Sequence, residues 1–139
     1  MSANVLDAEA LQAVVDRAPF HRWLDVRVDQ VDESGVGLSV PWRDEIGEAA
    51  AAHGGILAAL VDLVADQAIA AKLGQGLPTI DLRTDYHGAA RAGRLRGRGV
   101  VVRMGRSVVT ADAWIYDEGG ALVASGRGTY FNRQGGGGS

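Results

Sequence analysis

One long apolar stretch, which runs from His53 to Leu73, restricts the folds open to this chain more than any other feature. Between Ile56 and Leu73 it contains neither glycine nor proline, and alanine and leucine dominate it, so helix propensity favours one uninterrupted helix. Apolar residues lie almost all the way round this helix, which is typical of a buried helix rather than one on a surface. The rest of the fold is therefore expected to cover it.

Two features of this helix carry chemistry. Asp62 and Asp66 lie one turn apart on the same face. An unpaired buried charge costs free energy, so a carboxylate on a buried helix indicates a structural partner or a functional role. Gly54 and Gly55 precede the helix, where open backbone N–H groups attract an oxygen that carries negative charge. Since neither Ser nor Thr stands at position 53 as a cap, we interpret the two glycines as a backbone binding site.

The bulk properties restrict the class of protein. The 139 residues fit one domain, and a net charge of −3 argues weakly against nucleic acid as the main partner. Cysteine is absent, which excludes disulfides and thiolate chemistry. No segment is apolar enough to span a membrane, and no signal peptide is visible. We therefore expect a cytoplasmic protein with neither a nucleic acid nor a membrane as its partner.

Alternation of apolar and polar residues predicts the elements on either side of the central helix. Before it, we expect an N-terminal helix within residues 1–19 that Pro19 ends, then half-buried strands at 24–29 and 36–42 and a loop at 43–52. After it, we expect strands at 80–86, 95–104, 107–117 and 121–131, with short turns between successive strands.

These elements predict an α+β fold in which an antiparallel sheet of about six strands curls round one long buried helix. Residues 1–134 form a single domain in this interpretation, and the GGGGS sequence at 135–139 is a linker-like tail. The three histidines lie too far apart in the sequence to suggest a zinc site, and no cysteine assists them. We expect no metal.

At this point the chain resembles a known family, the hotdog-fold acyl-CoA thioesterases of the phenylacetic-acid (PaaI-like) type, over about residues 20–132. The strongest match is His53-Gly54-Gly55 followed by Asp62, nine residues after the histidine, within an apolar helix. The weaker matches lie in the strands that follow: Thr79-Ile80-Asp81-Leu82, Asp85-Tyr86, Gly105-Arg106-Ser107 and Ala124-Ser125-Gly126.

The resemblance implies a reaction and a site. In this family the helix carboxylate, here Asp62, acts as nucleophile or as general base for water. The amide after the histidine, here Gly54, helps to hold the thioester carbonyl oxygen. A Ser or Thr at the position of Thr79 is often implicated in orienting the water or the carboxylate. Coenzyme A enters as part of the substrate, so the resemblance implies no separate cofactor.

Several further residues have two interpretations. His53 is either a general base or a structural residue that shapes the loop before the helix, and Asp66 is either a solvated or interface carboxylate or a substrate contact. Gly55, Arg106 and Ser107 complete the predicted substrate-binding set. Seven of the thirteen arginines fall between residues 83 and 106. The arginines from Arg91 to Arg106 either form solvated strand and loop faces or include at least one that contacts the phosphates of coenzyme A, whose geometry arginine matches better than lysine does.

Two rival functions remain open. Gly47 stands where many members of the family carry Asn or Gln, and the alanine run at 49–52 is also unusual, which favours a non-catalytic or engineered binding or assembly module. The loop histidine, His53, keeps a hotdog dehydratase or hydratase possible as the enzymatic alternative.

Self-association is expected, as a homodimer or a homotetramer, because a curled sheet leaves two exposed edges. Gly54 and Asp62 are eight residues apart on one helix, which separates them by roughly 12 Å at about 1.5 Å per residue. If both act on one carbonyl group, they belong to different protomers.

Overall fold

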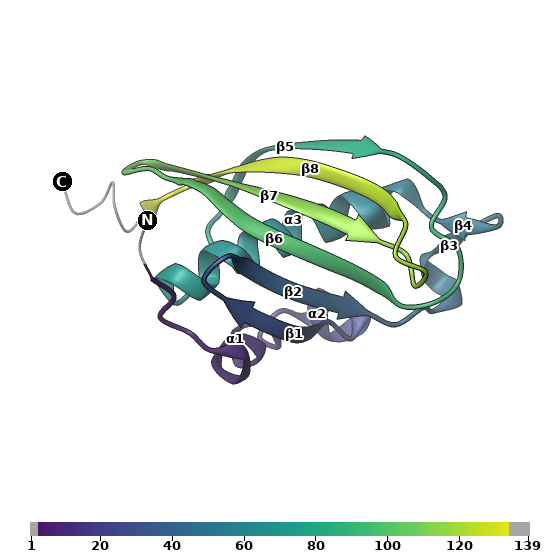
Figure 1. Ribbon diagram of the computed structural model, residues 1–139, viewed down its shortest axis with the longest axis horizontal. Helices are drawn as coiled ribbons and strands as arrows, with labels where there is room; N and C mark the ends of the chain where they lie inside the picture. Colours follow the sequence, from purple (N-terminus) through teal and green to yellow (C-terminus); the bar gives the residue numbers. More distant parts are fainter. Residues whose placement is uncertain (1–2, 134–139) are drawn as a thin grey trace.

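The computed structural model describes residues 3–133 and has the predicted α+β architecture of a hotdog fold (Figure 1). A six-stranded antiparallel sheet, in the order β1-β2-β6-β7-β8-β5, curves round the 20-residue helix α3. Among the described residues, no helix is both long enough and apolar enough to cross a membrane. The prediction of a linker-like tail at residues 135–139 lies outside the described residues.

The elements follow one another along the chain with short connections. The helices are α1 (Ala8–Val15), α2 (Pro19–Leu24), the 3-10 helix η1 (Asp44–Ile46) and α3 (Gly54–Leu73). The large sheet contains β1 (Arg27–Asp32), β2 (Gly35–Val40), β5 (Thr79–Tyr86), β6 (Leu95–Met104), β7 (Val108–Tyr116) and β8 (Leu122–Phe131). A separate small hairpin consists of β3 (Gly47–Glu48) and β4 (Ala51–Ala52).

The N-terminal region differs from the prediction of one helix that Pro19 ends. Helix α1 ends at Val15, and Pro19 instead begins α2, which extends to Leu24. Proline suits the first position of a helix because its missing N–H has no intrahelical acceptor there and its φ angle is already helical. The first strand therefore starts later than predicted, at Arg27, after Asp25 has closed α2 in a left-handed conformation (φ 58°).

Strands β5 and β6 follow each other in the sequence but are not neighbours in the sheet, which corrects the expectation of short turns between successive strands. β5 pairs with β8 at one edge, whereas β6 pairs with β2 and β7 in the middle. The segment between them crosses the end of the sheet (Figure 1). Consequently β5 is an open edge, and it carries the exposed side chains of Ile80 and Tyr86 (56% and 55% exposed).

Helix α3 packs so closely on the sheet that only glycine fits beneath it. A Cβ atom at Gly97 would lie 2.6 Å from a methyl carbon of Val64, and one at Gly99 would lie 2.4 Å from the Val64 carbonyl oxygen. The helix buries eleven of its residues, and each large apolar side chain among them contributes roughly 1.5–3 kcal/mol of stability. The helix therefore has a fixed position relative to the strands.

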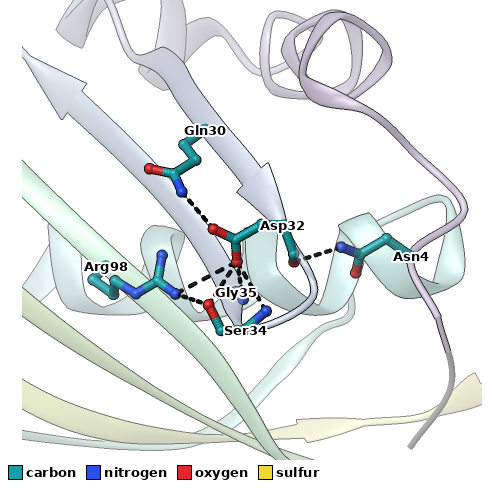
Figure 2. A network of polar contacts seen from close by, with 6 residues as sticks. All are labelled: Asn4, Gln30, Asp32, Ser34, Gly35 and Arg98. Atoms are coloured by element: carbon teal, nitrogen blue, oxygen red, sulfur yellow. Dashed lines mark hydrogen bonds and ion pairs between the residues drawn. The ribbon is translucent and has the colours of Figure 1, made fainter.

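The turn between β1 and β2 is held by one carboxylate, Asp32 (Figure 2). Its Oδ1 accepts hydrogen bonds from the Ser34 hydroxyl (2.6 Å), the Ser34 N–H (2.8 Å) and the Gly35 N–H (3.1 Å). The Gln30 side chain donates to Oδ2, and Arg98 of β6 lies 3.6 Å from Oδ1. The Ser34 donors, followed by Gln30 and Arg98, lower the pKa of Asp32 to about 2.

Candidate active site

Asp62 lies in the middle of α3 and is half-buried. Its Oδ1 accepts a hydrogen bond from the Thr79 hydroxyl at the start of β5 (3.0 Å) and another from the Tyr130 hydroxyl in β8 (3.0 Å). The Tyr130 hydroxyl also lies 3.1 Å from the Asp62 carbonyl oxygen. Two donors thus orient the carboxylate through one oxygen, while Oδ2 accepts no hydrogen bond from any residue in the range 3–133.

Tyr130 is the member of this cluster that the sequence analysis did not select. Its side chain is fully buried, and this burial, together with the Asp62 charge, raises the pKa of the hydroxyl far above its ordinary value. The hydroxyl therefore stays a donor. It occupies the space above Gly128, where a Cβ atom would lie 2.2 Å from the tyrosine oxygen. The spacing Gly-x-Tyr places both residues on one face of a strand, and this is the sequence signal that could have identified Tyr130.

Asp66 lies one turn after Asp62, under the loop that follows α3. Its Oδ1 accepts a hydrogen bond from the Leu77 N–H (2.9 Å), and a Cβ atom at Gly76 would lie 2.6 Å from its other oxygen. Burial raises the pKa of Asp66 to about 7, with a smaller contribution from the charge of Asp62, against the opposing effect of the Leu77 hydrogen bond. This carboxyl group therefore carries a proton through much of the acidic range, and it is not a freely solvated residue.

His53 caps the start of α3 in the way that Ser or Thr usually does. Its Nδ1 accepts a hydrogen bond from the Gly55 N–H (2.8 Å), and its Nε2 lies 3.7 Å from a Glu48 carboxylate oxygen. A Ser or Thr would be the expected cap at this position, but an imidazole nitrogen can accept the same N–H. The Gly55 amide is therefore occupied. The acceptor role of Nδ1 gives the neutral ring its proton on Nε2.

Gly54 is the first residue of α3, and its N–H donates to no acceptor in the described part of the chain. The Tyr86 hydroxyl at the far end of β5 donates to the Gly54 carbonyl oxygen (2.7 Å), and the tyrosine ring lies 3.5 Å from the position of a Cβ atom at Gly54. Since α3 is continuous, Gly54 and Asp62 are roughly 12 Å apart along its axis. One carbonyl group cannot contact both within one chain.

The predicted loop at 43–52 contains η1 and the β3–β4 hairpin, in which Gly47 pairs with Ala52. A Cβ atom at Gly47 would lie 3.2 Å from both the Asp44 carbonyl oxygen and the Trp42 ring. A side chain at this position would therefore require the Trp42 ring or the backbone of Asp44 to shift by a few tenths of an ångström. The departure from the family pattern at Gly47 goes together with a closed, packed hairpin next to the start of α3.

Arg106 and Ser107 lie in the turn between β6 and β7, at the end of the sheet opposite the β3–β4 hairpin (Figure 1). Both are exposed, and the turn is held by Asn132, which donates to the carbonyl oxygens of Ser107 (2.8 Å) and Gly105 (3.0 Å). Within one chain, this turn is separate from the helix start.

The predicted site residues therefore fall into three groups. The structure brings Asp62 together with Thr79, and Asp66 lies one turn along the same helix. His53, Gly54 and Gly55 form a second group at the helix start, and Arg106 with Ser107 forms the third. The three groups do not meet within a single chain.

Comparisons with known proteins agree with this architecture. Residues 50–124 match the family model described as the thioesterase superfamily. A solved structure described as a protein from the thioesterase superfamily shares 43% identity, covers 91% of this chain and 98% of that chain, and superposes with a TM-score of 0.87. No protein with a curated description matches.

Two other solved structures are similar over most of their length. A Shewanella oneidensis protein described as related to the thioesterase superfamily is 29% identical, with 93% of this chain and 99% of that chain covered and a TM-score of 0.75. The zebra fish thioesterase superfamily member 2 is 26% identical, with 89% and 94% covered and a TM-score of 0.77.

Proposed function

Because the chain belongs to the thioesterase superfamily, we propose that it hydrolyses acyl-CoA thioesters with Asp62 as the reacting carboxylate. Membership supports thioester hydrolysis in general. The observation that supports Asp62 is its setting on a packed helix, with Oδ1 held by Thr79 and Tyr130 and Oδ2 left open. The acyl-CoA substrate and the phenylacetic-acid-type branch rest on the resemblance of the His53-Gly54-Gly55 motif and its spacing to Asp62.

In the proposed reaction, Asp62 Oδ2 acts on the thioester carbonyl carbon in one of two ways. As a general base it takes a proton from the attacking water; as a nucleophile it forms an anhydride that water then opens. In both routes the Gly54 N–H stabilises the negative charge that develops on the carbonyl oxygen. The carbon–sulfur bond breaks, the thiolate takes up a proton, and the products are a carboxylic acid and a thiol. Thr79 and Tyr130 position the carboxylate.

The site is shared between two protomers in this proposal, which requires a homodimer or a tetramer built from such dimers. The roughly 12 Å between Gly54 and Asp62 supports it, since the two groups must contact adjacent atoms of one thioester. The open edge β5 supplies a second argument, because unpaired strand edges favour pairing. Tyr86 of this edge contacts Gly54, so an interface along β5 would reach the helix start.

The reaction is tested with a panel of acyl-CoA thioesters by measuring the release of free thiol. Absorbance of a conjugated enoyl group is followed in parallel, because its gain or loss would identify a dehydratase or hydratase instead. His53 Nδ1 already accepts the Gly55 N–H, so that alternative would have to use Nε2, which lies 3.7 Å from Glu48. We expect thiol release without any change in conjugation. Neither signal, with acyl-CoA binding retained, would contradict hydrolysis and indicate a binding module.

A further inference from the structure

A groove of about 620 Å³ lies on the face of the sheet that points away from α3. Arginines dominate it, and among the residues that line it only Asp29 is acidic. The lining residues are Arg27, Asp29, Gln30, Gly37, Leu38, Ser39, Arg94, Arg96, Gly97, Arg98 and Tyr116. Since Gly97 faces the helix, its strand neighbours Arg96 and Arg98 point to the opposite face. The groove is therefore separate from the Asp62 cluster.

The shape of the groove follows from the strand register. Gly37 and Ser39 of β2 form a floor of small residues between the longer side chains of β1 and β6. In one row across four strands, Arg27 pairs with Ser39, Ser39 with Arg96, and Arg96 with Tyr116. Directly paired residues of antiparallel strands lie on the same face. Two arginines thus flank one small hydroxyl residue, with an aromatic ring at the end of the row.

The charge of the groove is concentrated rather than incidental. Arg94, Arg96 and Arg98 occupy alternate positions, so their side chains share one face and repel one another. The chain as a whole has a net charge of −3, so this cluster does not reflect a basic composition. Arg98 lies near Asp32 and Arg27 near Asp25, but Arg94 and Arg96 have no carboxylate partner among the described residues. A bound anion would stabilise these two charges.

Two of these guanidinium groups are held in place and one is left available. Arg98 donates to the Ser34 hydroxyl (2.5 Å) and lies 3.6 Å from Asp32, as Figure 2 shows. Arg94 donates to the Ser39 hydroxyl (3.0 Å). Arg96 is exposed and has no hydrogen bond or ion pair within the described residues. Such preorganisation lowers the entropy lost when a ligand binds.

We propose that this groove binds a nucleoside polyphosphate. Guanidinium groups match phosphate oxygens in bidentate geometry, and several of them in one groove favour a ligand with more than one phosphate. Tyr116, beside Arg96, supplies an aromatic surface of the kind on which bases stack. The volume lies within the range of small-molecule sites. The same chemistry is present in a free nucleotide and in the nucleotide half of coenzyme A, so the experiment must separate these sources.

Isothermal titration with ADP, inorganic pyrophosphate and adenosine tests the binding. ADP is expected to bind most tightly, pyrophosphate less tightly, and adenosine weakly, with affinity falling as salt is raised. Arg96→Gln is expected to weaken ADP binding about 10-fold or more, which is the usual effect of losing a charge-assisted hydrogen bond. Arg103→Gln removes the same charge from β6 outside the groove and is expected to bind ADP as the original chain does.

A second arm identifies the source of the nucleotide and depends on the proposed hydrolysis. If the groove holds the nucleotide half of the substrate, Arg96→Gln raises the KM for an acyl-CoA and leaves kcat unchanged. If the groove holds a separate nucleotide, Arg96→Gln leaves the KM for an acyl-CoA unchanged, while the original chain still binds ADP. Both results support the site. The proposed site would be overturned if the original chain failed to bind ADP and pyrophosphate at millimolar concentration. It would also be overturned if Arg96→Gln bound ADP as tightly as the original chain does. A chain that hydrolyses no thioester would leave the result of these titrations unchanged.

Discussion

Asp32 and Asp66 are the same side chain in two regions of the molecule, and they differ in charge at neutral pH for a physical reason. Asp32, in the β1–β2 turn, accepts hydrogen bonds from both groups of Ser34, from Gly35 and from Gln30. Asp66, on α3, is more deeply buried, and within residues 3–133 it accepts one hydrogen bond, from the Leu77 N–H. The pKa is about 2 in the first region and about 7 in the second.

The difference shows which contacts decide whether a carboxylate on α3 is charged. Hydrogen-bond donors stabilise the charged form, whereas burial opposes it. Asp62 differs from both in its contacts, because Thr79 and Tyr130 donate to one of its oxygens while the other remains open. A turn carboxylate that is saturated with donors stabilises structure, and one with an open oxygen is available for chemistry.

The largest effect is expected from the carboxylate with the open oxygen. Asp62→Asn keeps an acceptor for Thr79 and Tyr130 but removes the charged oxygen that acts on the thioester. Thiol release should fall about 10³-fold or more, while acyl-CoA binding and the circular dichroism spectrum stay unchanged. Asp32→Asn is the matched control, since it makes the same change in the turn. Full activity in Asp62→Asn would refute the assignment.

The next effect concerns the donors to Asp62. Tyr130→Phe removes the hydroxyl that holds Oδ1 and leaves the buried ring in place. A hydrogen bond to a charged group contributes about 1.5–3 kcal/mol, so kcat should fall about 10- to 100-fold. Steady-state kinetics at several pH values provides the measurement. An unchanged kcat would show that Thr79 alone orients the carboxylate.

Asp66→Asn should change the pH dependence of stability. The folded-state pKa of about 7 lies above the ordinary value of 3.8, so the protonated form favours the fold. Stability from this residue is present below about pH 4 and is lost as pH rises towards 7. The loss is on the order of 2 kcal/mol between roughly pH 5 and pH 7. Asn keeps an acceptor for the Leu77 N–H, so urea unfolding of the variant should lack this slope. An identical slope in both chains would contradict the pKa assignment.

The smallest effect is expected in the turn, and with the opposite sign. The folded-state pKa of Asp32, about 2, lies below the ordinary value of 3.8. Its contribution to stability is therefore present above about pH 4 and lost as pH falls through 2. Asp32→Asn should melt at a slightly lower temperature at neutral pH and lose less stability on acidification. Thermal melts of both chains at pH 2, 4 and 7 provide the measurement. If the melting temperatures of the original chain and of Asp32→Asn changed in parallel with pH, this prediction would be contradicted.

The parts of the fold that follow from local pattern were predicted correctly. Helix α3 was visible because its apolar residues form a run without glycine or proline, and the strands that follow it were visible from alternation. The place of β5 at the edge was not, because its residues pair with residues of β8 that lie 38 to 51 positions later, and such pairing depends on non-local contacts. Local signals around Pro19 were compatible with either the end or the start of a helix.

The candidate site was predicted in its chain positions but not in its contacts. Asp62 and Thr79 come together in the structure, yet Tyr130 was missed because its role depends on the register of β8 and on the space above Gly128. The cap by His53 was missed because imidazole is an uncommon acceptor at that position. The contrast between Asp32 and Asp66 depends on burial, which the sequence does not report.

The central claim, that Asp62 and the Gly54 amide act on one thioester from different protomers, is tested by mixing two inactive chains. The first carries Asp62→Asn and the second Gly54→Pro, which removes the N–H and adds the proline ring. Proline fits there because Gly54 is the first residue of α3 and His53 already has the extended conformation (φ −59°, ψ 136°) that precedes proline. Gly54→Ala, which keeps the N–H, is the control and should remain active.

The measurement is the rate of thiol release by the purified heterodimer of these two chains. One of its two sites combines an intact Asp62 with an intact Gly54 amide, so the account predicts about half the activity of the original dimer, while each parent homodimer is inactive. A proven heterodimer with no activity, formed from chains that both fold, would contradict the shared site.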